Sequence, residues 1–250
     1  MRQDFARMTG RRYGEGVMRK LVRTALVLAA CSFLPATPAF AQAEQSDEYM
    51  CRNGAFPDEN RQYRLAKVKG AAGDKVHFYG DSHKRCPAGE GCRLQSYVVP
   101  NDEVIVSRTY GTFACSWFQP RKGSETVGWI ETDRLAWTEV NRQPAEREWL
   151  GEWRGWDNNY IRISKAREGG ALTIVGHATW ATGAPNEHSG ELDYSAKPSG
   201  DRLSFSDGDH ENDCRVAMQL VGKYLVVKDN VRCGGVNVSF SGIYLKRARR

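Results

Sequence analysis

Short runs in which apolar and polar residues alternate occupy most of the chain after residue 60. Residues 64–68 (Arg-Leu-Ala-Lys-Val) and 160–164 (Tyr-Ile-Arg-Ile-Ser) have the two-residue period of a strand with one buried face. Turn-forming residues, such as those at 73–74 and 100–102, separate the runs. Only residues 144–150 suggest a helical turn or two. The pattern therefore predicts an all-β protein without a long helix.

The predicted strands fall into two groups, and residues 142–148 separate them. The first group predicts a small barrel or sandwich within a domain at residues 42–141. The second group, in a domain at residues 149–246, contains about seven or eight runs, which predicts an antiparallel meander barrel or sandwich. Residues 247–250 are predicted to be a basic tail.

The first 41 residues have the features of a secretory signal peptide. Basic residues precede an apolar run over residues 24–34, and Ala39, Phe40 and Ala41 form a small-residue cleavage site. The apolar run is shorter than the about 20 residues that span a bilayer. We therefore expect no transmembrane segment, cleavage after Ala41 and a mature protein in the periplasm.

Cys31 offers an alternative fate for this leader. Residues 28–31 (Leu-Ala-Ala-Cys) resemble the lipobox of bacterial lipoproteins, in which the cysteine is acylated and becomes the first mature residue. The apolar run continues past Cys31 and is followed by a good cleavage site. These two features favour soluble export over a lipid anchor.

The net charge of +6 does not describe the mature protein. Residues 1–41 carry +5 and the basic residues from Lys246 onward carry +4, which leaves −3 for residues 42–245. Proteins that bind nucleic acid usually present a basic domain. We therefore expect no nucleic acid partner.

Six of the seven cysteines follow the leader, and an even number in an oxidising compartment indicates disulfides. One predicted pair flanks a short flexible loop, another flanks a predicted hairpin, and the remaining two cysteines then pair with each other. Zinc is the competing interpretation, but there is no C-x-x-C pair and no histidine at ligand spacing beside the cysteines. The predicted disulfides are Cys51–Cys115, Cys86–Cys92 and Cys214–Cys233.

Three motifs carry a resemblance to a known family. They are residues 97–106, in which a Pro-Asn-Asp turn leads into an apolar strand, the aromatic strand at 114–118, and the Gly-Trp-Ile strand at 128–130. Over residues 60–137 the chain resembles the bacterial SH3-like domain. The resemblance implies a small β-barrel, and many members of that family bind cell-wall peptides or glycans. The cysteines and the inserted loop at 86–92 depart from the commonest family pattern.

The end of the chain carries a second resemblance. Residues 229–244 are similar to the ends of envelope domains of proteobacteria. This resemblance implies a compartment and a fold, and it implies no activity.

The sequence contains no catalytic motif, neither a nucleophile elbow nor a phosphate-binding glycine loop. His177, Glu187, His188 and Asp193 would form a metal or acid–base set only if they converged in space. We therefore predict a non-enzymatic protein with no catalytic residues, no metal and no cofactor. An enzyme is the third hypothesis.

Aromatic side chains are the candidate binding residues, because their amphipathic rings suit sugar faces and protein hot spots. Our first hypothesis is a periplasmic module that binds peptidoglycan or an envelope protein. The second is an inhibitor or immunity protein against a cell-wall hydrolase or toxin, which would insert loop 86–92 or loop 183–190. The candidate ligand-binding residues are Tyr97, Tyr110, Trp117, Trp153 and Trp156.

Overall fold

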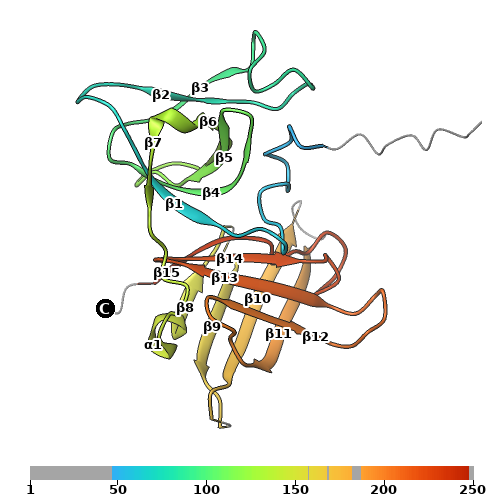
Figure 1. Ribbon diagram of the computed structural model, residues 1–250. Helices are drawn as coiled ribbons and strands as arrows, with labels where there is room; N and C mark the ends of the chain where they lie inside the picture. Colours follow the sequence, from blue (N-terminus) through green and yellow to red (C-terminus); the bar gives the residue numbers. More distant parts are fainter. Residues whose placement is uncertain (1–46, 157, 168, 182–186, 248–250) are drawn as a thin grey trace, which may run out of the picture. The chain divides into compact units, whose positions relative to one another are not determined.

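The structure is a computed structural model that describes residues 47–247, apart from residues 157, 168 and 182–186 (Figure 1). The described residues form fifteen strands, one α-helix of four residues and one short 3₁₀ helix, so the predicted all-β fold is confirmed. The expected leader, the lipobox at Cys31 and residues 248–250 lie outside the described residues. The described residues belong to one compact unit.

Seven strands from the first half of the chain form one antiparallel sheet, in the spatial order β3-β2-β6-β5-β4-β1-β7. The 3₁₀ helix η1 (Thr132–Arg134) connects its last two strands in the sequence. The strands are β1 (Arg64–Val68), β2 (Val76–Tyr79), β3 (Arg93–Val98), β4 (Glu103–Tyr110), β5 (Phe113–Phe118), β6 (Thr126–Glu131) and β7 (Leu135–Thr138).

This first sheet buries apolar side chains on both of its faces. In β4, Val104 and Val106 contribute to one buried cluster, whereas Ile105 between them contributes to another. Successive side chains of a strand point to opposite faces, so the uninterrupted apolar run of β4 requires cover on both sides. On one face the side chains pack against one another, because the sheet bends round on itself. On the other face they pack against residues of the second half of the chain.

Eight strands from the second half form another antiparallel sheet, in the order β11-β10-β9-β8-β15-β14-β13-β12. The short helix α1 (Glu146–Trp149) precedes it. The strands are β8 (Gly151–Arg154), β9 (Tyr160–Lys165), β10 (Leu172–Ala181), β11 (Glu187–Ala196), β12 (Arg202–Ser206), β13 (Arg215–Val221), β14 (Tyr224–Asp229) and β15 (Gly242–Lys246).

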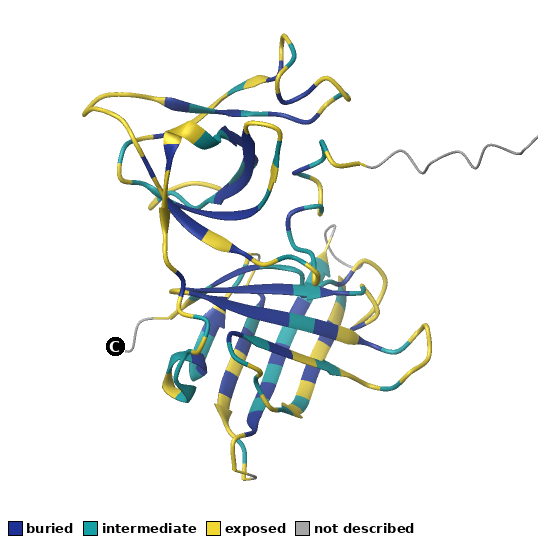
Figure 2. Ribbon diagram, in the orientation of Figure 1, coloured by how far each residue is buried: buried dark blue, intermediate teal, exposed yellow. Residues whose placement is uncertain are grey.

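The second sheet curls into a nearly closed barrel. Its two edge strands meet through side chains, because the rings of Tyr194 on β11 and Phe205 on β12 stack with their centroids 4.2 Å apart. Buried and less buried residues alternate along β10 and β11 (Figure 2). Eight strands enclose only enough space for their own side chains, and here Trp153, Phe240 and Tyr244 help to fill it. The barrel interior is therefore a packed core.

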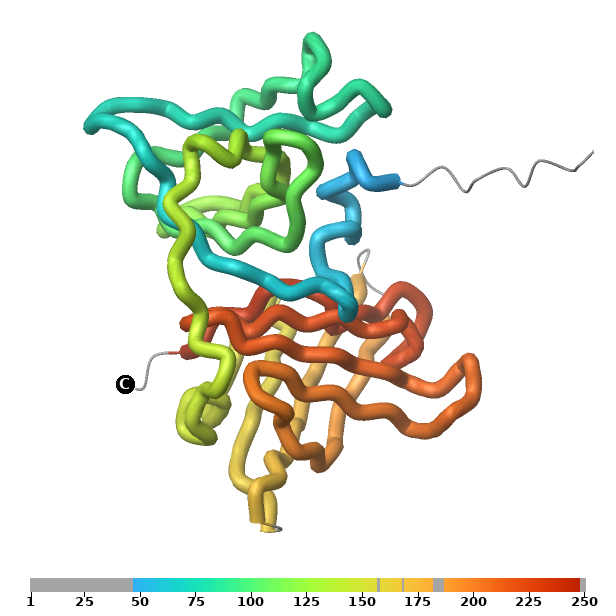
Figure 3. The backbone as a smooth tube through the Cα atoms, in the orientation of Figure 1, coloured from blue at the N-terminus to red at the C-terminus, as the bar shows by residue number. Residues whose placement is uncertain are grey.

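The two sheets share one buried cluster. Tyr224, Val226 and Ile243, on the outer face of β14 and β15, pack with Leu65 and Trp117 of the first sheet. Residues 47–62 run from the first sheet to the second, as the backbone trace shows (Figure 3).

Two buried polar residues of the second sheet reinforce this contact. Gln219 Oε1 accepts a hydrogen bond from the backbone N–H of Tyr63 at 3.3 Å. Asp201 accepts from Arg142 and from Gln219, both at 2.7 Å. The two halves of the chain are therefore joined by both apolar and polar contacts.

Three disulfides brace the fold, in the pairs predicted from the sequence: Cys51–Cys115, Cys86–Cys92 and Cys214–Cys233. The first closes the longest segment, with a sequence separation of 64 residues, and ties the N-terminal segment to β5. The second closes a loop between β2 and β3. The third fastens the long connection between β14 and β15. No helix in the described part of the chain is long and apolar enough to span a membrane.

Gly190 on β11 allows a close approach between two backbone segments. A Cβ atom at this position would lie 2.3 Å from the carbonyl oxygen of Cys233. We expect Gly190→Ala to lower the free energy of unfolding by about 2 kcal/mol, because the connection held by Cys214–Cys233 would have to shift. Urea denaturation would measure this change. Gly169→Ala is the matched control, since no atom lies within 4 Å of its added Cβ, and an equal loss in both variants would contradict the explanation.

Candidate functional site: a cleft lined by two tryptophans

A cavity of about 420 Å³ lies where the N-terminal segment, the β5–β6 turn and the β14–β15 connection meet. Its volume is in the range of small-molecule sites in proteins. We call it the tryptophan cleft. It is lined by Arg52, Asn53, Gly54, Phe56, Pro57, Trp117, Glu125, Val127, Trp156, Lys228, Val231, Ser239, Ser241, Gly242 and Ile243.

Trp156 is the exposed aromatic residue of the cleft, with 45% of its surface accessible. It lies in the turn between β8 and β9, where the backbone N–H of Gly155 donates to Asn159 O and the N–H of Asn159 donates to Trp156 O, both at 2.9 Å. Its indole lies over Gly242, where an added Cβ would come within 3.4 Å of the ring. The turn and this contact hold the indole at the cleft, where almost half of its surface stays exposed.

Trp117 forms the floor of the cleft and is 1% exposed. Its indole Nε1–H donates to Glu125 Oε2 at 2.7 Å, and its ring packs edge-on against Tyr224 with a centroid distance of 5.6 Å. The ring of Trp117 is therefore covered by protein and presents almost no surface to a ligand. Its contribution is to position Glu125, whose other carboxylate oxygen accepts no hydrogen bond from a described residue.

The N-terminal segment provides the next wall and is fixed to the first sheet by Asp81. This carboxylate is buried and accepts from the backbone N–H of Cys51 (2.7 Å) and Arg52 (2.8 Å) and from Arg52 Nε (2.6 Å). Burial raises the pKa of Asp81, but these hydrogen bonds and the guanidinium of Arg52 outweigh it and lower the pKa below its usual value. Asp81 is thus a charged anchor that fixes the backbone at Cys51 and Arg52.

Tyr63 holds the same segment farther along the chain. Its hydroxyl donates to Phe56 O at 3.1 Å and accepts from Asp58 N at 2.7 Å. Burial raises the pKa of Tyr63 to about 12, so the hydroxyl stays protonated and can donate. These hydrogen bonds hold Phe56 and Pro57 in position beside the cleft.

The β14–β15 connection closes the opposite side of the cleft, and buried Asp229 organises it. Asp229 accepts from Ser239 Oγ at 2.6 Å, from Ser241 Oγ at 2.5 Å and from the N–H of Phe240 at 3.1 Å. Val231, in the same connection, has a φ of 55° and is 57% exposed. A β-branched residue rarely adopts this left-handed conformation, and such strain is frequent at ligand sites.

The remaining predicted aromatic residues lie outside the cleft. Tyr97 is 44% exposed on β3, where Lys75 Nζ lies 4.6 Å from the centre of its ring. Tyr110 is half-buried against Trp129. Trp153 is 1% exposed inside the barrel and donates to Trp149 O at 2.9 Å, so its ring is part of the core and presents almost no surface to a ligand. Residue type could not distinguish these cases, because tryptophan is common both in cores and in binding sites.

The histidines proposed as a metal or acid–base set do not converge. His177 on β10 lies directly opposite Glu191 on β11, and its Nδ1 is 2.6 Å from Glu191 Oε1. His188 lies opposite Trp180, three positions farther along β10. An odd offset along a strand places side chains on opposite faces of the sheet. His177 and His188 therefore lie on opposite faces of the sheet and do not form one site.

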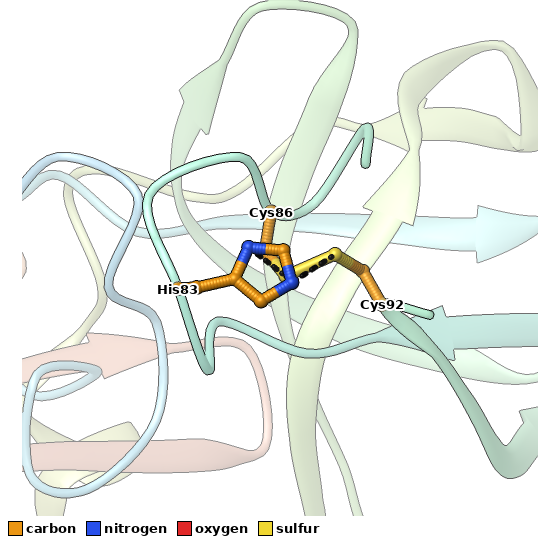
Figure 4. A group of neighbouring side chains, drawn as sticks. All are labelled: His83, Cys86 and Cys92. Carbon is orange, nitrogen blue, oxygen red and sulfur yellow. Dashed lines mark hydrogen bonds between the residues drawn. A yellow bond between two sulfur atoms is a disulfide. The ribbon is translucent and has the colours of Figure 1, made fainter. Parts of the chain in front are cut away.

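His83 is a neighbour of the Cys86–Cys92 disulfide that the sequence reasoning missed. Its Nε2 lies 3.5 Å from Cys86 Sγ and 3.8 Å from Cys92 Sγ (Figure 4). Within the described residues, these three form the one group whose ligand atoms are close enough together to hold a metal ion. The sulfurs are bonded to each other, however, and a metal binds the thiolate form. The imidazole is best described as a packing partner of the disulfide.

Two further cavities adjoin the cleft. One, of about 310 Å³, is crossed by hydrogen bonds from Arg202 to the carbonyls of Glu59 and Arg61. The other, of about 610 Å³, contains Arg108, which donates to the carbonyl of Met50. The polar groups in both cavities mainly hold the N-terminal segment in place. The tryptophan cleft differs because it combines an exposed aromatic face with unpaired polar atoms.

Comparisons of this chain with protein-family models, with curated proteins and with solved structures found no match.

Proposed function

We propose that the protein is an exported, non-enzymatic component of the cell envelope that binds peptidoglycan or an envelope protein through the tryptophan cleft. The observation that carries the proposal is the exposed indole of Trp156 in a cavity of ligand size, beside Glu125 and Arg52. An aromatic face next to a few directed polar groups is the usual chemistry of carbohydrate and peptide recognition.

The compartment is part of the same proposal. The leader-like residues 1–41 and the pairing of all six remaining cysteines support export to the periplasm. The proposed relation of residues 60–137 to bacterial SH3-like domains would agree with a wall ligand. In our proposal the binding surface keeps Trp156 from the sequence-based candidates and adds Lys228 and Val231 from the same half of the chain.

Sedimentation of the mature protein (residues 42–250) with purified peptidoglycan tests this function. We expect the wild type to sediment, and Trp156→Ala to bind about 30-fold more weakly, since a central tryptophan at an interface contributes about 2 kcal/mol. Trp137→Ala is a matched control. Trp137 is 44% exposed but lies on β7, where Arg64 stacks on its ring outside the cleft.

The outcomes separate the two classes of partner. Wall binding that depends on Trp156 and not on Trp137 supports a wall ligand. If the wild type stays in the supernatant, peptidoglycan is eliminated, and an envelope protein captured by wild type but not by Trp156→Ala becomes the expected partner. Equal wall binding by both tryptophan variants and the wild type would remove the cleft from the proposal.

A further inference from the structure

We propose that the tryptophan cleft recognises a carboxylate of its ligand, with Lys228 as the charge-recognising residue. This inference rests on the proposed function and names the chemical class of ligand, an acidic peptide or sugar. The observations that carry it are the position of Lys228, its lack of a counter-ion and its place where the three cavities meet.

Lys228 occupies an unusual position for a lysine. Along β14, every second side chain points to the same face, so Lys228 shares a face with Tyr224 and Val226. This face packs against the first sheet. Tyr224 and Val226 are buried in that contact, and Lys228 is half-buried at its end. It lines all three adjoining cavities. A cation therefore extends from an apolar interface into the space open to a ligand.

The side chain of Lys228 forms no ion pair or hydrogen bond with any described residue. Lys223, at the start of the same hairpin, is paired with Glu103 at 3.0 Å. Partly removing an ammonium group from water costs free energy unless an opposite charge or hydrogen-bond acceptors compensate it. An anionic ligand group would provide that compensation at Lys228.

Arg52 is arranged differently from Lys228. Its Nε donates to Asp81, which also balances its charge. One of its terminal nitrogens packs beside Gly80, where an added Cβ would lie 3.2 Å from it. Glu125 is the one acidic side chain that lines the cleft, and Asp58 and Glu59 line both adjoining cavities. Arg52 is balanced by Asp81, whereas none of the described carboxylates lies within ion-pair distance of Lys228.

The combination defines the ligand class. Trp156 provides an aromatic surface for a sugar ring or an apolar group, and Lys228 provides an ammonium donor for a carboxylate. A neutral glycan would leave Lys228 without a counter-ion. Peptidoglycan stem peptides carry free carboxylates beside methyl groups, which matches this arrangement.

The test uses N-acetyl-D-alanyl-D-alanine as the free acid and as its C-terminal carboxamide. Both probes are titrated into the mature protein, and the indole N–H signal of Trp156 is followed, assigned by its absence in Trp156→Ala. We expect the acid to bind about tenfold more tightly than the amide, because hydrogen bonds to charged groups are the stronger ones. Lys228→Gln should remove this preference and Lys228→Arg should retain it.

Lys67→Gln controls for the change in net charge, because Lys67 is exposed on β1 and lines none of the three cavities. It should keep the preference for the acid. Equal affinity for acid and amide in the wild type, no binding of either probe, or a preference that survives in Lys228→Gln would each overturn the inference.

The failure of this inference is distinguishable from failure of the proposed function. Peptidoglycan sedimentation that depends on Trp156, together with equal binding of acid and amide, overturns the role of Lys228 and leaves wall binding in place. If the protein prefers the acid but does not sediment with peptidoglycan, the carboxylate site is supported. The ligand in the proposed function is then another acidic component of the envelope.

Discussion

The double variant Cys51→Ala/Cys115→Ala is expected to lose about 4 kcal/mol of its free energy of unfolding. The disulfide closes a segment with a sequence separation of 64 residues, and the entropy that such a cross-link removes from the unfolded chain grows with the length of the closed loop. Both cysteines are fully buried, so the variant also loses packing in the cluster that the two sheets share. Urea denaturation measures the change.

Cys86→Ala/Cys92→Ala is the matched control for this prediction. The two cysteines are almost as buried, but their sequence separation is only 6 residues. The same reasoning gives a loss of about 2 kcal/mol. A larger loss in the short-loop variant would contradict the loop-length explanation. We also expect only the Cys51 and Cys115 variant to weaken ligand binding, because that disulfide fixes the segment carrying Arg52 and Phe56 beside the cleft.

Asp81→Ala is expected to lower the free energy of unfolding by about 3 kcal/mol at neutral pH. The substitution leaves two backbone N–H groups and the guanidinium of Arg52 without their acceptor. Asp74→Ala is the control, since Asp74 is exposed and accepts one hydrogen bond, from Ala71 N at 2.8 Å. That control should lose about 1 kcal/mol or less, again in urea denaturation.

The same carboxylate predicts a pH dependence. The pKa of Asp81 is lower in the folded protein than in the unfolded chain, where it is about 3.9. Its contribution is therefore fully present above that value and is lost as the pH falls through the lower pKa of the folded state. Asp81→Asn should lack this acid-induced loss. If wild type and Asp81→Asn show the same dependence of unfolding free energy between pH 5 and pH 2, Asp81 is not the anchor described here.

Periodicity was sufficient to predict the fold class and the two groups of strands. A two-residue alternation of apolar and polar side chains identifies a strand that can bury one of its faces. This alternation is a local property of the sequence. The disulfide pairs also followed from local features, because a short loop and a hairpin each brought one pair of cysteines together and left one further pair.

The tertiary structure decided which aromatic residues can meet a ligand. Trp153 and Trp156 are three residues apart and of the same type, yet one fills the barrel and the other is 45% exposed. Trp117 has the chemistry of a binding residue, but the second sheet covers it with Tyr224. Such outcomes depend on which sheet packs against which face, and no local pattern contains that information.

Lys228 is the clearest example of the difference between what the sequence predicts and what the tertiary structure decides. Its place in an alternating strand predicts only that it points to the side opposite Val227. That this side is covered by the first sheet, and that three cavities meet there, follows from contacts between residues far apart in the sequence. The sequence by itself determined the strands, the cysteine pairs and a set of candidate aromatic residues. Packing between the two sheets alone decided where the cleft lies, because a site made of separate segments exists only after they are brought together.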